Sequence, residues 1–299
     1  MFLASPITFP NLGIEINPSP VAFTVFGKDI YWYGIIIAAG FLLAVFYMLA
    51  RAKDFGITQD DVLDMILWAV PIGVICARLY YCIFYWELYA DDPISILYIW
   101  EGGLAIYGGI IGGFLFGGLA CKWRKVPVLP MFDLTAMGFL VGQCCGRWGN
   151  FFNQEAFGCN TTLPWGMYSE GTRSYLMGST VTVQNGVTID PNLPVHPTFL
   201  YESLWNLVGL LLIVLIVAKH RRFDGENTLC YFLWYGLGRF WIEGLRTDSL
   251  YLFDWTIGGA PIRVSQALSA VMVLVSAFLL VWNLWVKPHK PEELYVNIV

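Results

Sequence analysis

The chain has 299 residues and a net charge of −5, and 57% of its residues are hydrophobic while only 13% are charged. Soluble domains are about 25% charged, so this chain could not cover a soluble globule of its size. Disorder needs low hydrophobicity and high charge, and nucleic-acid binding needs a basic stripe, so both are excluded. We therefore expect an integral membrane protein whose partner is a lipid bilayer, with no nucleic acid.

The first 28 residues hold four prolines and no basic region, unlike a cleaved signal peptide. We expect residues 1–29 to form an external N-terminal segment. Seven apolar stretches follow, each long enough to cross a hydrocarbon core about 30 Å thick. These predicted helices lie near residues 30–50, 62–86, 97–121, 131–149, 199–218, 228–246 and 264–286.

Lysines and arginines between the stretches predict the orientation of the chain. Ten lie in one set of connections and four in the opposite set, and the denser set is expected in the cytoplasm. The N-terminus is then outside and the tail, residues 287–299, is cytoplasmic. Residues 30–149 carry helices one to four, and residues 199–286 carry helices five to seven. The long connection between them, residues 150–198, becomes a small external loop or head region.

Cysteine and histidine are too scattered to predict a metal site. The seven cysteines include no C-x-x-C pair, and most lie in apolar runs. The three histidines are far apart, and none belongs to an H-E-x-x-H pattern. We expect no metal centre and no disulfide framework.

Ionisable residues inside the predicted spans gather near the outer leaflet. They include Arg78, Arg147, Arg239, Glu202 and Glu243. Charge inside a bilayer is costly, and the arginine fork is suited to phosphate, so the cluster favours a site for an anionic lipid headgroup. The alternative interpretation is structural: the arginines pair with the carboxylates or with backbone carbonyls and hold the bundle together, as the i,i+4 spacing of Arg239 and Glu243 permits.

The third stretch is rich in glycine. Gly108 with Gly112 and Gly109 with Gly113 form G-x-x-x-G pairs, which favour close helix packing. The alternative is a narrow groove or broken segment through which a lipid passes. Tyr107 in this stretch is either an interfacial anchor or a substrate contact.

The most specific segment ends the fourth stretch and reads G-R-W-G-N-F-F-N-Q-E-A-F-G from Gly146 to Gly158. It resembles the G-R-x-G-N-F-x-N-x-E-x-x-G signature of the bacterial prolipoprotein diacylglyceryl transferases. Other motifs of that family are matched in order and spacing, and they are Tyr33-Gly34, Gly102 to Gly109, His196 to Glu202, and Tyr235 to Arg246 followed by Asp248.

The resemblance implies an enzyme. It would move the diacylglyceryl group of phosphatidylglycerol onto the thiol of the lipobox cysteine in the signal peptide of an exported prolipoprotein. A thioether forms and glycerol phosphate leaves, in the first step of bacterial lipoprotein maturation. The resemblance also implies a multi-pass protein of the bacterial cytoplasmic membrane, with its active site toward the outer leaflet. No cofactor is expected, because the phosphate ester is itself the leaving group.

The family's functional residues can be carried over to matching positions. Arg147 and Arg239 are implied to clamp the phosphate and to stabilise its negative charge on departure. Glutamates would orient the arginines or accept protons, and Gly158 would let the chain turn closely against the lipid. The implied catalytic residues are Arg147, Arg239, Glu155 and Glu243, and the implied substrate-binding residues are Tyr33, Tyr107, Asn150, Gly158, Glu202, Tyr235 and Arg246.

Tyr107 departs from the family pattern, in which many members carry a histidine that has been proposed as the base. A neutral phenol is a poor base near pH 7. Either Tyr107 only positions the lipid, or a carboxylate takes the proton, or the arginines favour an ionised thiol. We favour a positioning role.

Two other functional classes fit the composition and topology. A transporter or flippase for an anionic lipid would use the same arginines, but it should show internal repeats, which we do not find. A seven-span receptor would need no interfacial arginine clamp. The motifs favour the transferase.

Overall fold

The computed structural model describes residues 5–178, 183–184, 187–257 and 260–299. The chain divides into two compact units. The larger unit comprises Met1–Tyr47 and Thr135–Lys290, and the smaller unit comprises Met48–Leu134 and Pro291–Val299.

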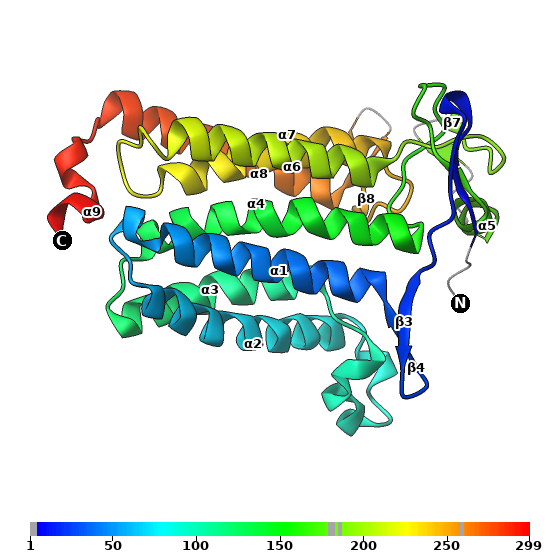
Figure 1. Ribbon diagram of the computed structural model, residues 1–299, viewed down its shortest axis with the longest axis horizontal. Coiled ribbons are helices and arrows are strands. Elements are labelled where there is room, and N and C mark those ends of the chain that lie inside the picture. The colour runs from blue at the N-terminus through cyan, green and yellow to red at the C-terminus, as the bar shows by residue number, and fades with distance from the viewer. Residues whose placement is uncertain (1–4, 179–182, 185–186, 258–259) are drawn as a thin grey trace. The chain divides into compact units, whose positions relative to one another are not determined.

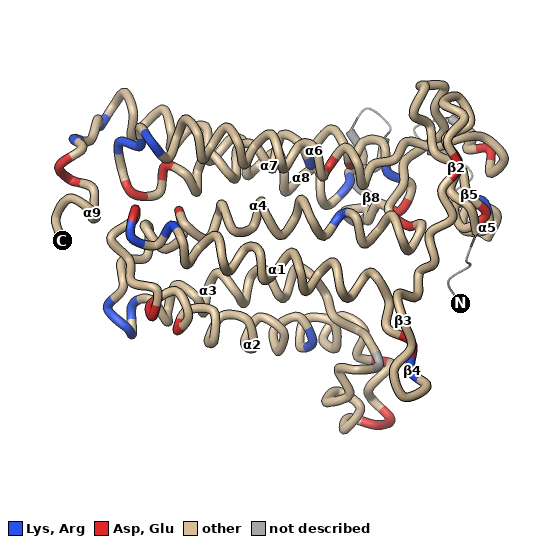
Figure 2. The backbone as a smooth tube through the Cα atoms, in the orientation of Figure 1, with Lys and Arg blue, Asp and Glu red and all other residues tan. Residues whose placement is uncertain are grey.

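Among the residues that the structure describes, six helices are long and apolar enough to cross a membrane. They are Trp32–Phe55, Gln59–Phe84, Ile106–Arg124, Val128–Asn153, Thr198–Val217 and Val264–Val286. Lysine, arginine, aspartate and glutamate lie mainly toward the ends of these helices, which leaves their middles uncharged (Figure 2). The structure is thus that of a helical membrane protein, as the composition predicted.

Helix α7, Glu226–Leu245, coincides with the sixth predicted stretch but does not belong to that set of six. It is 20 residues long and therefore long enough to span. Its interior carries Arg239 and Glu243, which make it less apolar than the others.

In the larger unit, α6 (Thr198–Leu212), α7 and α8 (Val264–Val281) run side by side (Figure 1). The last turns of α6 and α8 continue as π-helices, Ile213–Val217 and Trp282–Val286. Helices α1 (Trp32–Arg51) and α4 (Val128–Asn153) contribute to this unit their residues up to 47 and from 135.

A reciprocal tryptophan pair fixes α6 against α7. The indole N–H of Trp205 donates to the Trp234 carbonyl, and that of Trp234 donates to the Trp205 carbonyl, both at 2.8 Å. The two rings stack with centroids 4.5 Å apart. Each indole lies over a glycine of the opposite helix, Gly209 or Gly238, where an added Cβ would collide with the ring. Any side chain there would push the helices apart.

One end of the larger unit is an ordered region rather than an open loop. Strand β1 (Ile7–Phe9) pairs antiparallel with β2 (Ile14–Ile16) and with β5 (Tyr168–Ser169), and α5 (Glu170–Gly178) follows β5 directly. Its apolar core is formed by Ile7, Phe151, Phe157, Met167, Leu176, Ile189, Val195 and Phe199. Residues from the N-terminus, the end of α4, the 150–198 segment and α6 are therefore packed together.

Two-stranded hairpins complete the strands of this unit. They are β3 (Val21–Val25) with β4 (Lys28–Tyr31), β6 (Val183–Gln184) with β7 (Val187–Thr188), and β8 (Tyr251–Ile257) with β9 (Ala260–Arg263).

The smaller unit is built on α2 (Gln59–Phe84) and α3 (Ile106–Arg124). A Cβ added at Gly108 would lie 2.5 Å from the Cys76 carbonyl oxygen, and one at Gly112 would collide with the Cys76 Cβ. Close packing is therefore the role of these two glycines, as one of the two interpretations of the G-x-x-x-G pairs predicted. The short helices of the unit are Ala52–Phe55, Trp86–Leu88, Pro93–Leu97, Ile99–Glu101, Pro291–Glu293 and α9 (Tyr295–Ile298).

The third span begins later than the sequence predicted. We expected it from residue 97, whereas α3 begins at Ile106 and the preceding residues form 3-10 turns. Gly102 and Gly103 have φ angles of 92° and 71°, which break any helix before α3. Apolar composition alone could not reveal this break.

Candidate active site

The candidate site lies in the larger unit and begins at the end of α4. The helix ends at Asn153, and the next residues turn sharply, with Gln154 at φ 53° and Ala156 at φ 56°. Non-glycine residues rarely adopt this conformation, so the surrounding structure has to hold it. The Gln154 amide donates to the Ser5 carbonyl at 2.8 Å and accepts from the Gly171 N–H at 3.2 Å, and the Thr198 hydroxyl donates to the Ala156 carbonyl.

Gly158 ends this turn at a point where three segments meet. Its N–H donates to the His196 carbonyl at 2.8 Å. A Cβ here would lie 2.8 Å from the His196 Cβ and 3.0 Å from the Leu245 carbonyl oxygen. Gly158 therefore permits close contact between protein segments, and the close approach to lipid that the resemblance implied stays a prediction.

Within the described part of the chain, three arginines from different elements contact one carboxylate, that of Glu202 on α6. Arg147 of α4 forms an ion pair with Oε2 of Glu202. Arg239 of α7 donates to Oε1 at 2.9 Å, and Arg246, just beyond α7, lies 3.5 Å from the same oxygen. Glu202 is only 4% exposed, so its charge needs these partners.

The arginines have further partners on α7 and in the residues that follow it. Arg239 pairs at 2.7 Å with Glu243, one helical turn away. Arg246 holds Asp248 through two hydrogen bonds, of 2.9 and 2.7 Å. Burial alone would raise the pKa of Asp248, but these hydrogen bonds and the charge of Arg246 outweigh it and lower that pKa. The pairing of arginines with carboxylates, which the sequence analysis gave as the structural alternative, is therefore present. The side chains of the three arginines are still partly exposed, at 12–22%.

Glu155 contacts amides. Its Oε1 accepts from Asn150 at 2.9 Å and from Asn153 at 3.2 Å. The resemblance implied that Glu155 orients arginines or accepts protons. Its contacts in the structure are with the two asparagine amides of the signature segment, and the implied role stays a prediction.

Tyr33 and Tyr235 lie on α1 and α7. The Tyr33 ring packs directly on Gly149, where a Cβ would come within 2.8 Å of it. Tyr235 stacks on Tyr231 with ring centroids 5.7 Å apart, one turn before Arg239 on the same helix.

Tyr107 and Arg78 belong to the smaller unit. Tyr107 is in the first turn of α3. The Arg78 guanidinium donates to backbone carbonyls, including those of Ile96 at 2.9 Å, Ser95 at 2.8 Å and Gly102 at 2.6 Å. The structural interpretation therefore holds for Arg78, which fixes the loop before α3.

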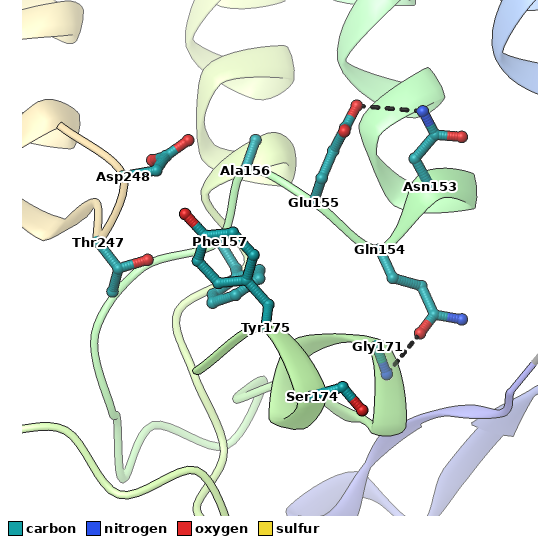
Figure 3. Close-up of a pocket in the computed structure, with 10 residues that line it drawn as sticks. All are labelled: Asn153, Gln154, Glu155, Ala156, Phe157, Gly171, Ser174, Tyr175, Thr247 and Asp248. Atoms are coloured by element: carbon teal, nitrogen blue, oxygen red, sulfur yellow. Dashed lines mark hydrogen bonds between the residues drawn. The ribbon is translucent and has the colours of Figure 1, made fainter. Parts of the chain in front are cut away.

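Two pockets adjoin the signature segment and share Asn153 in their linings. We call the first the polar pocket; its volume is about 370 Å³ (Figure 3). It is lined by Asn153, Gln154, Glu155, Ala156, Phe157, Gly171, Ser174, Tyr175, Thr247 and Asp248. We call the second the α1 pocket, which has about 540 Å³ and is lined by Asp29, Ile30, Tyr31, Tyr33, Gly34, Ile35, Ala38 and Asn153.

The predicted site residues include none from α5, and Asp248 was noted only as the residue that follows the Tyr235–Arg246 motif. Its position two residues after Arg246 was the signal that could have placed it in the site. Ser174 and Tyr175 carry no such signal, because only the packing of α5 against the signature turn brings them to the pocket.

Comparisons with known proteins agree with the motifs. The family model described as prolipoprotein diacylglyceryl transferase matches residues 20–282. A phosphatidylglycerol–prolipoprotein diacylglyceryl transferase of Limosilactobacillus reuteri (strain DSM 20016) is 41% identical over 290 residues, which are 96% of this chain and 98% of the relative. One from Clostridium novyi (strain NT) is 43% identical over 265 residues, 88% of this chain and 95% of the relative. One from Clostridioides difficile (strain 630) is 41% identical over 254 residues, which are 85% of this chain and 91% of the relative.

Proposed function

Because the chain belongs to the prolipoprotein diacylglyceryl transferase family, and is therefore a transferase of lipoprotein maturation, we propose that its arginine cluster binds the phosphate of phosphatidylglycerol. The diacylglyceryl acceptor is a prolipoprotein. The observation that carries the assignment of the site is the meeting of Arg147, Arg239 and Arg246 around Glu202. Guanidinium groups offer paired donors that match phosphate oxygens.

The proposed reaction is a displacement at carbon. The sulfur of the lipobox cysteine attacks the diacylglyceryl carbon that bears the phosphate. A C–S bond forms, the C–O bond breaks, and glycerol phosphate leaves with the electron pair. Negative charge therefore grows on the phosphate as it departs, and Arg147 and Arg239 stabilise it most at that stage.

The carboxylates of Glu202 and Glu243 have a positioning role in this proposal. Glu202 fixes the forks of Arg147 and Arg239 from one side, and Glu243 fixes Arg239 from the other. Holding three arginine side chains before the substrate arrives avoids the entropy of ordering them during the reaction. Asn150 and Tyr33 are proposed to hydrogen-bond the headgroup from α4 and α1.

Tyr107 is proposed to position substrate rather than to act as the base. The cysteine proton then goes to a carboxylate, or the arginines favour a thiolate. Tyr107→Phe should leave much of the activity, while Arg147→Ala should lower it by about 100-fold or more. Equal losses in the two variants would contradict the positioning role.

We further propose that α7 is a seventh span, with the N-terminus outside and the C-terminus in the cytoplasm. The distribution of lysine and arginine supports this orientation. The site then faces the outer leaflet of a bacterial cytoplasmic membrane, where an exported prolipoprotein presents its lipobox.

The direct test is a transfer assay. Purified protein is incubated with phosphatidylglycerol vesicles and a lipobox peptide, and the mass gain on the cysteine is measured. If wild type shows no gain while lipid binding is demonstrated, the proposed reaction is rejected. Undiminished transfer in Arg239→Ala would reject the phosphate clamp.

A further inference from the structure

The polar pocket differs in chemistry from the arginine cluster. Its lining offers the carboxylates of Glu155 and Asp248, the hydroxyls of Ser174 and Tyr175, and the amide of Gln154. None of the lining residues in the described part of the chain is lysine or arginine. Acceptors and hydroxyls without a cation do not suit a phosphate, but they suit a small group that carries hydroxyls.

Asp248 links this pocket to the arginines. It lines the pocket and also holds Arg246 at 2.9 and 2.7 Å, and Arg246 lies 3.5 Å from Glu202. A carboxylate has about four acceptor sites, of which Arg246 uses two. Asp248 can therefore accept a ligand hydroxyl although its charge is already balanced, which favours a neutral polyol over an ammonium group.

Glu155 and Tyr175 supply further groups on the same pocket. The amides of Asn150 and Asn153 both donate to Oε1 of Glu155. Among the described residues, Oε2 therefore remains available to accept a hydrogen bond from a ligand. The Tyr175 ring extends from α5 toward Asp248 (Figure 3). Partial burial raises the pKa of the Tyr175 phenol, Asp248 adds to the rise and Arg246 opposes it. The hydroxyl therefore stays protonated and can donate.

We infer that the polar pocket binds the terminal glycerol of the phospholipid headgroup, with Tyr175 and Ser174 as specificity-determining residues. The inference rests on the proposed function, because it needs the phosphate of the same lipid to lie at the arginines. Phosphate and polyol would then occupy adjacent places on either side of Asp248. Selection among anionic phospholipids would depend on the hydroxyls of the headgroup.

The test compares two lipid substrates that differ only in those hydroxyls. Phosphatidylglycerol and phosphatidylpropanol have headgroups of three carbons and the same charge. Wild type should transfer from phosphatidylglycerol with the higher kcat/KM. Tyr175→Phe should lower kcat/KM for phosphatidylglycerol about 3- to 10-fold, the value of one hydrogen bond, and leave that for phosphatidylpropanol unchanged. Ser174→Ala should act in the same direction.

Matched controls separate specificity from folding. Tyr175→Phe keeps the aromatic ring, whose centroid lies 5.4 Å from that of the Phe157 ring. Tyr168→Phe removes a phenol hydroxyl from β5, outside the lining of the pocket. This variant should leave kcat/KM unchanged for both lipids. Wild type that uses the two lipids equally, variants that lose both activities alike, or a preference for phosphatidylethanolamine would each overturn the inference. Failure of wild type to transfer from phosphatidylglycerol at all would instead reject the proposed function.

Discussion

At the scale of single residues, Glu202 is the centre of the candidate site. The resemblance placed it among the substrate-binding residues, and a charge inside a predicted span also needs a reason. The structure shows its contacts with Arg239 at 2.9 Å and Arg246 at 3.5 Å. Spacing along the chain predicted only the Arg239–Glu243 pair, because the others depend on how α4, α6 and α7 pack.

Glu202→Gln and Glu155→Gln form a matched pair of variants. Glu202→Gln leaves buried arginine charge without its partner, a change that costs about 3–5 kcal/mol in known cases. Glu155 is exposed and contacts amides, so its variant should change stability little. Thermal unfolding in detergent measures both midpoints. Equal midpoints in the two variants would contradict the central role of Glu202.

Asp248 predicts a pH dependence of stability. Its pKa is lowered in the folded chain, so its contribution is present above its unfolded pKa of about 4 and is lost as the pH falls through the folded value. Wild type should therefore be more stable than Asp248→Asn at neutral pH, and the difference should shrink below about pH 4. Unfolding midpoints across this range measure it, and a difference independent of pH would refute the assignment.

At the scale of elements, glycine patterns predicted packing well and helix ends poorly. The G-x-x-x-G pairs of α3 indicated close packing, and Gly108 and Gly112 do touch α2. The start of the same helix was placed nine residues too early, because apolar 3-10 turns and an apolar helix have the same composition. The 150–198 segment likewise gave no sequence signal for the position of α5.

The α2–α3 contact can be tested with alanine substitutions. Alanine at Gly108 or Gly112 forces a Cβ against Cys76 or its neighbours, and overpacking of this kind costs about 1–3 kcal/mol. Gly113→Ala is the control, because no described atom lies within 4 Å of the new Cβ. Alanine there should keep or slightly raise the unfolding midpoint. Similar losses at all three glycines would contradict the contact.

At the scale of the whole molecule, the apolar composition predicted a helical membrane protein, and six described helices meet that expectation. The sixth predicted stretch, α7, carries the charges of the site and is less apolar for that reason. Of the helices that coincide with the seven predicted stretches, α7 is the one outside the described set of six, and it contributes Arg239 and Glu243. The charges of the candidate site thus lower the hydropathy of α7, which is the property by which a span is recognised.

The proposed orientation predicts the outcome of reporter fusions. Alkaline phosphatase joined after residue 192 should be active, and the same reporter joined after residue 125 or residue 220 should be inactive. Green fluorescent protein at the C-terminus should fluoresce. An inactive fusion after residue 192 together with an active fusion after residue 220 would reverse the orientation and place the site at the cytoplasmic face.

The carboxylate of Glu202 has one more consequence. It already pairs with one nitrogen of Arg147 and one of Arg239, so in the proposed function an incoming phosphate would share these arginines with a resident anion. A carboxylate that competes for the same arginines lowers their affinity for any phosphate, including that of the product. We therefore expect that, when glycerol phosphate leaves, the arginines keep Glu202 as their partner, so that no unpaired cationic cluster remains to retain the product.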